Sequence, residues 1–401
     1  MKFGVFYEHQ LPRPWTVDAE HQLFKDSLDE IELADQLGFD YAWEVEHHFL
    51  EEYSHSSAPE VFLAAASQRT KNIRLGHGIV QLTTNHPSRV AERVSTLDLV
   101  SDGRVELGLG EGSSVTELHP FKRRFRDKRV IWEDAVRATL PMFYKDNWAY
   151  EGEYFDFPAR NVIPKPLQKP HPPLWVACSQ LETIIMAGRR GMGALGFAFV
   201  SPEAATAWVN AYYNEYTKRL DPLTDYQTNP AIAVVAGFMC CKTDEEARKK
   251  AEGWTFFQFS LRFYNKYGPI GPGDVNLWEE YEAWKKTPEG ENESAEGLIG
   301  SPETIRAKLH EFEATHVDQV ILLNQAGKNK HEDIASSLKM FAEEVMPEFH
   351  ARESQHQEWK QSVLAGEIEL EELDTNPYDV AARQKPSLKP GSAPTLASGK
   401  W

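Results

Sequence analysis

Short apolar runs alternate with longer segments of helical periodicity along the first 110 residues. The runs predict four strands, at residues 3–7, 39–43, 73–80 and 104–109. Between the first two, Phe24, Leu28 and Ile31 recur at spacings of four and three, which places them on one helix face, and Gly38 stands where a glycine ends such a helix. Four strand–helix steps in so few residues imply parallel strands joined by crossover helices.

The same alternation continues after an interruption that contains a small predicted hairpin at residues 150–155. Further strands are predicted at residues 174–178, 194–199, 232–241 and 317–323, and further helices at 182–190, 202–220, 302–314 and 331–346. Eight parallel units favour an α/β fold closed as a (β/α)8 TIM barrel, because closure leaves no edge strand. The alternative, an open Rossmann-type sheet, normally carries GxGxxG after its first strand, and no such motif follows Tyr7.

Two segments fall outside this alternation. Residues 264–297 form a long excursion rich in glycine, proline and glutamate, and a loop of this length in a compact domain is usually functional or disordered. Beyond residue 350 the chain becomes acidic and then rich in proline, serine and lysine. We therefore expect one barrel over residues 1–350 and a mobile C-terminal extension over residues 351–401.

Charge and composition narrow the possible partners. The 401 residues carry a formal net charge of −18 and contain no basic block, which argues against a nucleic-acid or membrane surface as partner. The N-terminal apolar stretch is too short for a secretory signal, and no run approaches the roughly 18–20 apolar residues of a membrane span. The three cysteines, two of them adjacent, make neither a disulfide framework nor a CxxC metal site. We expect a cytoplasmic protein.

Candidate chemistry lies where strands end, because (β/α)8 barrels place their active sites at the carboxyl ends of the strands. His47 and His48 leave the second predicted strand, and since neighbouring residues point to opposite sides, at most one should face the barrel mouth. Histidine suits general acid–base chemistry. The alternatives are two structural histidines with backbone partners, or a metal site, which the adjacent spacing does not favour.

Further polar residues follow the fourth and fifth strands. Gly108 and Gly110 alternate at the end of the fourth, where glycine allows close approach to a flat ligand or simply tight packing of the barrel. Ser179 and Thr183 stand between the fifth strand and its helix, as phosphate contacts or as ordinary helix caps. Arg129 belongs to a basic segment whose ordinary interpretation is a solvated helix face.

Several segments, taken together and in order, resemble the bacterial luciferase family of flavin monooxygenases, especially the α subunit. The matching segments are Lys2-Phe3-Gly4, Gly38-Phe39-Asp40, Glu46-His47-His48-Phe49, His86-Pro87-Ser88-Arg89, Leu97-Asp98-Leu99-Val100-Ser101-Asp102-Gly103-Arg104, Gly300-Ser301-Pro302-Glu303 and Phe341-Ala342-Glu343-Glu344-Val345-Met346-Pro347. The resemblance covers about residues 1–350. It implies the same barrel fold that the strand count predicts.

The resemblance also implies a chemistry. Reduced FMN (FMNH2) would bind at the strand ends and react with O2 to give a flavin C4a-hydroperoxide that oxidises a small organic substrate. His47 matches the family's catalytic histidine, and Glu117 stands at the position of an acidic residue. Since no NAD(P)H fingerprint is present, a separate flavin reductase would supply FMNH2, and pairing through early helices would make a homodimer.

The resemblance implies a cofactor site as well. Arg129, Ser179 and Thr183 fall where the family holds the FMN phosphate. The Gly78–Ile79 peptide matches a non-proline cis bond behind the flavin, and residues 264–297 match a mobile loop that closes over it.

The chain also departs from the luciferase pattern. Gly110 replaces a reactive cysteine beside the flavin, and Glu111 replaces an arginine that binds phosphate, so monooxygenation without light emission is expected. Three alternatives remain open. They are a deazaflavin-dependent hydride-transfer oxidoreductase on the same barrel, a non-catalytic partner subunit, and a metal-dependent hydrolase barrel.

Overall fold

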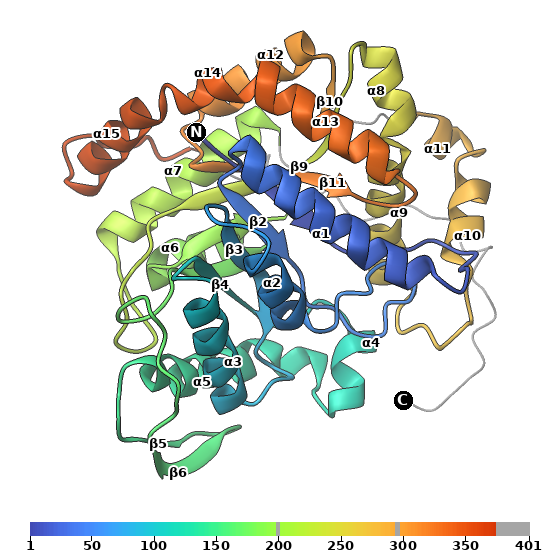
Figure 1. Ribbon diagram of the computed structural model, residues 1–401. Helices are drawn as coiled ribbons and strands as arrows, with labels where there is room; N and C mark the ends of the chain where they lie inside the picture. Colours follow the sequence, from blue (N-terminus) through green and yellow to red (C-terminus); the bar gives the residue numbers. More distant parts are fainter. Residues whose placement is uncertain (198–200, 293–296, 374–401) are drawn as a thin grey trace.

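A closed barrel of eight parallel strands forms the centre of the computed structural model, which describes residues 1–197, 201–292 and 297–373 (Figure 1). In order around the barrel the strands are β1 (Lys2–Tyr7), β2 (Tyr41–Glu44), β3 (Arg74–Gln81), β4 (Val105–Gly110), β7 (Leu174–Cys178), β8 (Gly193–Gly196), β9 (Ile232–Cys240) and β11 (Gln319–Gln325). β11 pairs with β1 and closes the ring, and the short β10 (Leu298–Gly300) adds to the outer side of β9. The predicted (β/α)8 fold is confirmed.

Helices surround the strands on the outside (Figure 1). Those that follow the barrel strands are α1 (Ala19–Leu37), α2 (Pro59–Ser67), α3 (Pro87–Val100), α5 (Lys128–Thr139), α6 (Leu181–Arg190), α7 (Pro202–Lys218), α8 (Asp244–Lys250), α9 (Glu252–Tyr267), α12 (Pro302–Ala314) and α13 (His331–Glu344). Gly38 ends α1 in the left-handed region at φ 86°, and the Ser301 side chain caps α12 by accepting from the Thr304 N–H. Local signals therefore set these boundaries as the sequence predicts.

The long connection between β4 and β7 carries short elements of its own. These are α4 (Val115–Leu118), the 3₁₀ turns η1 (His119–Phe121), η2 (Phe125–Asp127) and η3 (Leu140–Phe143), and the hairpin strands β5 (Trp148–Glu151) and β6 (Asp156–Arg160). The hairpin lies at the predicted position but away from the barrel (Figure 1). α4 with the loop before it, η1 and the start of α5 approach the strand ends of the site.

Large side chains fill the inside of the barrel. Trp43 of β2 and Trp175 of β7 meet edge to face with ring centroids 5.4 Å apart, and both are almost fully buried. Below them, the carboxylate of Glu106 accepts a hydrogen bond from Trp175 Nε1 at 2.6 Å and pairs with Arg74. The lumen is thus a packed core, which leaves the carboxyl ends of the strands as the place for chemistry.

Much of the expected 264–297 loop is helical. α9 extends into it as far as Tyr267, and α10 (Leu277–Trp284) and α11 (Pro288–Asn292) follow. The reason is a separate aromatic cluster, in which Phe256 and Phe259 of α9 pack against Tyr281 of α10 with ring centroids 5.4 and 5.6 Å away. Residues 293–296 of the segment lie outside the described residues.

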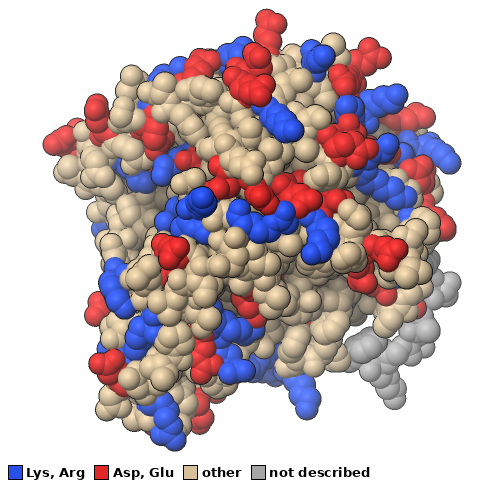
Figure 2. All heavy atoms as spheres, in the orientation of Figure 1, with Lys and Arg blue, Asp and Glu red and all other residues tan. Residues whose placement is uncertain are grey.

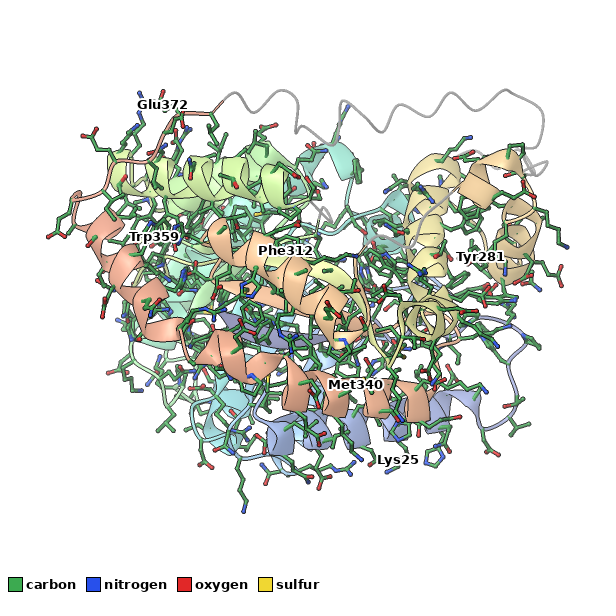
Figure 3. All side chains as sticks on the ribbon, turned by 90° about the horizontal axis from the view of Figure 1, so that it is seen from above. Lys25, Tyr281, Phe312, Met340, Trp359 and Glu372 are labelled. Carbon is green, nitrogen blue, oxygen red and sulfur yellow. The ribbon has the colours of Figure 1, made fainter. Side chains whose placement is uncertain are left out.

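The first part of the expected C-terminal extension is also helical. After α14 (Met346–His350), α15 (Glu353–Leu364) lies beside α7, and Figure 3 shows Trp359 and Tyr281 at opposite sides of the molecule. Trp359 stacks on His316 with centroids 3.9 Å apart and meets Tyr213 at 5.7 Å. We expected a mobile tail from residue 351 onward, but its start packs on the barrel, while residues 374–401 lie outside the described range.

The surface carries both signs of charge. Figure 2 shows Lys and Arg interleaved with Asp and Glu over one face of the molecule. Within the described ranges, no helix combines the length and the apolar character that crossing a membrane requires.

Candidate active site

The imidazole of His47 lies between two carboxylates at the mouth of the barrel. His47 leaves the end of β2, and its Nδ1 is 2.7 Å from Oε1 of Glu117 in α4. On the other side of the ring, Nε2 is 3.1 Å from Oε1 of Glu8, which directly follows β1. The side chain of His47 is 17% exposed, whereas both carboxylates are buried. A histidine in this setting can hold or pass a proton without losing its position.

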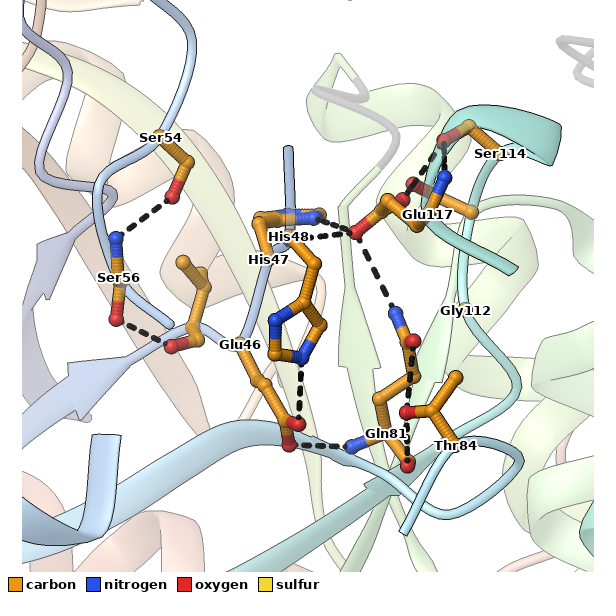
Figure 4. A network of polar contacts seen from close by, with 12 residues as sticks. Glu46, His47, His48, Ser54, Ser56, Gln81, Thr84, Gly112, Ser114 and Glu117 are labelled. Atoms are coloured by element: carbon orange, nitrogen blue, oxygen red, sulfur yellow. Dashed lines mark hydrogen bonds and ion pairs between the residues drawn. The ribbon is translucent and has the colours of Figure 1, made fainter. Parts of the chain in front are cut away.

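Glu117 is fixed by four donors besides His47 (Figure 4). The hydroxyls of Ser113 and Ser114 donate to its Oε2 at 2.7 and 2.9 Å, and Gln81 Nε2 and the backbone N–H of His48 donate to its Oε1, both at 3.4 Å. Burial on its own raises the pKa of Glu117, but the charge of His47 and the two hydroxyls outweigh it and lower the pKa to about 2. Glu117 is therefore a permanent anion.

Glu8 has a different environment. Its Oε1 has no hydrogen-bond partner in the described part of the chain apart from the ion-pair contact with His47. Burial raises the pKa of Glu8 above its ordinary value, and the nearby Glu44 carboxylate adds to this, although His47 opposes it. The two carboxylates on one imidazole thus respond in opposite directions, because only Glu117 receives hydroxyl donors. Glu8 is the one that can take up a proton.

His47 itself is held in its charged form. Burial on its own lowers the pKa of His47, but Glu117 and Glu8 together outweigh burial and hold the pKa well above its ordinary value. A further buried group lies behind Glu8, where His9 Nδ1 is 2.8 Å from Glu44 Oε1 and the Ser56 hydroxyl donates to the same oxygen. Four side chains from the ends of β1 and β2, Glu8, His9, Glu44 and His47, therefore lie close together here.

His48 serves a different carboxylate from its neighbour. Its Nε2 lies 3.0 Å from Oε1 of Glu46, and the Oε2 of Glu46 accepts from the Gln81 backbone N–H at 2.8 Å. Asn85 Nδ2 donates to Oε1 of Glu46 at 2.8 Å as well. Figure 4 shows the two imidazoles turned toward different partners, His47 to Glu117 and His48 to Glu46. Glu46 therefore ties the segment after β2 to the end of β3 and the loop that follows it, and His48 holds Glu46.

The three residues predicted to hold a phosphate gather at one place. Ser179 is exposed at the end of β7, and the Thr183 hydroxyl donates to the Gln180 carbonyl at 2.7 Å in the first turn of α6. Arg129 is close enough to Cys178 to act on its pKa, which burial raises to about 12. Arg129, however, pairs with Glu111, so its charge is already partly matched.

The predicted cis bond at Gly78–Ile79 is wrong. The cis peptide bonds of the described residues all precede proline, so Gly78–Ile79 is trans. β3 instead has an irregular register against β4 between His77 and Val80, and this shifts the backbone without a cis bond that would cost about 3–4 kcal/mol. A Cβ on Gly110 would lie 2.3 Å from Ile79 Cδ1, so this glycine admits the shifted strand. The predicted contacts of Gly78, Ile79 and Gly110 with a cofactor stay predictions.

The comparisons with known proteins agree with the barrel fold. Residues 1–319 match the family model described as luciferase-like monooxygenase. The chain belongs to the luciferase-like monooxygenase family. The resemblance inferred from the sequence is thereby confirmed. The chain spans only about half the length of two curated relatives that it matches, 51% and 48%.

Named relatives of this luciferase-like chain are oxidoreductases. It is 24% identical to the flavin-dependent trigonelline monooxygenase, oxygenase component, of Acinetobacter baylyi, over 87% of this chain and 96% of that protein. Monooxygenase RslO1 from Streptomyces bottropensis has a TM-score of 0.70 at 25% identity, covering 87% of this chain and 100% of that one. The coenzyme F420-dependent tetrahydromethanopterin reductase of Methanopyrus kandleri, at 20% identity, shares the fold with a TM-score of 0.64 over 87% and 99%.

Sequence reasoning found His47 and missed Glu8. Active sites of (β/α)8 barrels lie at the carboxyl ends of the strands, and this rule points to His47 after β2. For β1 it points to Glu8, which follows Tyr7 directly. Ser114 and Glu117 have the spacing of a capping box, which predicts the start of α4. The contacts of Ser113 and Ser114 in the site depend in addition on α4 lying next to the end of β2, which is a tertiary contact without a local signal.

Proposed function

We propose that the protein is the oxygenase component of a two-component flavin-dependent monooxygenase. It would take FMNH2 from a separate reductase and use O2 to oxidise a small organic substrate. The observation that carries the proposal is the imidazole of His47 held between the carboxylates of Glu8 and Glu117 at the barrel mouth of a luciferase-like chain. The relative from Acinetobacter baylyi, named as an oxygenase component, supports the need for a reductase partner.

The residues at the mouth fit FMN. A phosphate at this place would meet the hydroxyl groups of Ser179 and Thr183 and the N–H groups at the first turn of α6. Arg129 would add a cation when its ion pair with Glu111 opens. Next to Gly78, an added Cβ would be in ordinary contact with Trp43, Glu44 and Phe6 at 3.6 to 3.7 Å, so the backbone there has room for no more than a methyl group. When bound, reduced FMN supplies the electrons that activate O2.

The chain's own residues would manage protons and exclude water. His47 holds a proton at Nε2, opposite Glu8, while Glu117 fixes the Nδ1 side of the ring and so its orientation. Proton transfer of this kind contributes roughly 10²–10⁴ in rate. Tyr53 lies against His47 with ring centroids 5.5 Å apart and keeps this side of the imidazole dry. His47 and Glu117 are the catalytic pair in this proposal, and Glu8 is their positioning and proton-exchanging neighbour.

A second candidate is hydride transfer with a deazaflavin. The fold of the F420-dependent reductase and the match to an F420-dependent glucose-6-phosphate dehydrogenase of Amycolatopsis mediterranei favour it. A deazaflavin enzyme does not need O2, so the two candidates differ in one measurement. Binding and turnover with F420 in the absence of oxygen would replace the monooxygenase proposal.

The direct test is an anaerobic titration with FMNH2 followed by a pulse of ¹⁸O2 in the presence of candidate substrates. We expect tight binding of the reduced cofactor, and one ¹⁸O atom in the product. His47→Ala should bind FMNH2 as before but form no product, and unchanged turnover in this variant would remove His47 from the mechanism. Light scattering coupled to size exclusion tests the proposed homodimer on the same sample.

A further inference from the structure

A cavity of about 370 Å³ lies beside the site, between the loop after β2, the α4–η1 segment and the chain from α9 to α10. Its volume falls in the range of small-molecule sites, roughly 300–1,000 Å³. Most of the lining is apolar. The lining residues are Phe49, Glu51, Glu52, Val115, Thr116, His119, Pro120, Tyr264, Pro269, Ile270, Gly271, Pro272, Val275 and Leu277.

Hydrogen bonds join the chain from α9 to α10, on one side of this cavity, to the loop after β2 and to α4 on the other side. The carboxylate of Glu52 accepts from the backbone N–H groups of Leu277 and Trp278 at 2.6 and 3.1 Å, which also caps the start of α10. Glu51 accepts from the Gly273 N–H at 3.1 Å, and Thr116 Oγ1 accepts from the Ile270 N–H at 3.4 Å. The cavity is therefore preformed, so a ligand pays little ordering entropy on binding.

The charges around the cavity disfavour an anion. Among the residues that the structure describes, no lysine or arginine lines it, and its two carboxylates are engaged with backbone N–H groups and with Arg13, whose guanidinium lies 2.8 Å from Glu51. An anionic ligand would lose its hydration without gaining a cation and would meet the like charges of Glu51 and Glu52. A neutral ligand meets neither cost.

The lining favours flat rings. The Tyr264 ring forms one wall, and the Phe49 side chain, 56% exposed, stands at the rim. Phe49 has φ 65°, a left-handed conformation that is rare and costly for a bulky residue and is characteristic of functional sites. Aromatic faces pack on rings in offset or edge geometry with a gain beyond area burial.

Two ring contacts connect this cavity with His47. Tyr264 lies 6.0 Å from Tyr53, centroid to centroid, and Tyr53 lies 5.5 Å from the His47 ring. On the other side, Thr116 of the lining directly precedes Glu117. Tyr264 of the lining is thus connected with His47 through Tyr53, and α4 borders both the cavity and the proton-handling group.

We propose that this cavity receives the organic substrate, and that the substrate is an uncharged, mainly apolar molecule carrying a ring. That the bound molecule is the substrate rests on the proposed monooxygenase function, but the preference of the cavity for uncharged rings does not. Glu51, Glu52 and Thr116 act here as positioning residues, because they hold the chain from α9 to α10 in place over the ligand and do not contact reacting atoms.

The test uses the full-length protein without flavin and two probes that differ in charge, 2-naphthalenemethanol and 2-naphthoate, titrated by calorimetry. We expect the neutral alcohol to bind at least tenfold more tightly than the anion. Val275→Trp and Ile270→Trp, which fill the cavity from two different positions, should each weaken binding of the alcohol at least tenfold. Val61→Trp on α2, where Val61 is exposed, is the matched control and should bind as the unmodified protein does.

The outcomes separate the two proposals. Equal binding of the two probes would overturn the preference for an uncharged ligand, and unweakened binding in both cavity variants with intact thermal unfolding would overturn the site. Probe binding that survives while FMNH2 and O2 give no product would leave the cavity in place and remove the monooxygenase function. Product formation by the cavity variants at the unmodified rate would separate the cavity from the reaction.

Discussion

Glu8 and Glu117 hold the same imidazole, His47, at 3.1 and 2.7 Å, but only Glu117 is tied down by hydroxyl donors. Because of this asymmetry, Glu117 stays ionised while the pKa of Glu8 is raised by burial. A proton can therefore move between His47 and Glu8 without disturbing the bond to Glu117. The groups that face His47 are these two carboxylates, Glu44 behind Glu8, and the phenol of Tyr53.

Glu8→Gln removes a negative charge that raises the pKa of His47, so His47 should lose its proton at lower pH. The alkaline limit of activity should move to lower pH in parallel. Glu117→Gln should lower the pKa of His47 too, and it should also lower kcat, because the ring loses its fixed orientation. ¹⁵N NMR titration of the histidines measures the first effect without any cofactor.

Glu46→Gln is the matched control for both variants, since Glu46 contacts His48 and not His47. In Glu46→Gln, His47 should titrate at the same pH as in the unmodified protein. Glu8→Asp keeps a carboxylate at this position, so the pKa of His47 should be lowered less than in Glu8→Gln. If Glu8→Gln leaves the titration of His47 in place, the 3.1 Å contact contributes nothing to proton affinity and the role of Glu8 is lost.

How far the sequence predicts this molecule depends on how local each feature is. The strands follow from apolar runs of five to ten residues, and His47 follows from its place at a strand end. Glu117 could be named only through the resemblance, because its contact with His47 joins positions 70 residues apart. The trans bond at Gly78–Ile79 departs from the luciferase pattern because an irregular register in β3 does the same shift.

The helical segments that were missed share one cause. α9 is apolar on two faces, because Trp254 and Phe257 pack against the barrel core while Phe256 and Phe259 face α10. In α15, Trp359 and the buried Val363 provide the packing in an otherwise polar helix. Tertiary contacts of this kind override composition, which on its own suggested loops.

Glu111 and a bound phosphate would compete for the positive charge of Arg129. Arg129→Ala should weaken FMN through loss of a charge-assisted hydrogen bond, roughly 1.5–3 kcal/mol. Glu111→Gln frees the guanidinium, whose side chain is 37% exposed, and should tighten FMN by the small amount typical of a partly exposed pair, about two- to fivefold. Fluorescence quenching of FMN measures both, with riboflavin, which has no phosphate, as the control ligand. An effect of equal size on riboflavin would count against the phosphate assignment.

Arg104 ties two helix ends to the barrel. Its buried guanidinium donates to the carbonyls of Ser67 and Thr70 after α2, Ile73 before β3 and Ser101 after α3, at 2.8 to 3.2 Å. Arg104→Met leaves these carbonyls without donors and should destabilise the fold by about 3 kcal/mol or more. Urea unfolding monitored by circular dichroism measures the loss. Arg89→Met, at an exposed arginine, should change stability by less than about 0.5 kcal/mol.

Asp318 fastens α15 to the barrel, and this contact should depend on pH. Its Oδ1 lies 2.8 Å from His356 Nε2 and 3.0 Å from Lys360 Nζ, and its Oδ2 accepts from the Tyr213 hydroxyl and the Ile232 N–H at 2.7 Å. Burial on its own raises the pKa of Asp318, but Lys360 and His356 outweigh it and lower the pKa well below the ordinary 3.8. A carboxyl with a lowered pKa stabilises the fold above its ordinary pKa and loses this contribution as the pH falls below it.

Asp318→Asn should therefore destabilise the protein by about 3 kcal/mol at neutral pH, since it removes one member of a buried ion pair. The difference from the unmodified protein should shrink as the pH falls below 3.8, because the unfolded chain then takes up a proton on Asp318 that the folded chain, with its lowered pKa, does not. Asp146→Asn, at an exposed carboxylate, should show no such convergence. Chemical unfolding at a series of pH values measures all three proteins. A constant gap between Asp318→Asn and the unmodified protein down to pH 2 would mean that the amide geometry, and not the charge of Asp318, holds α15 in place.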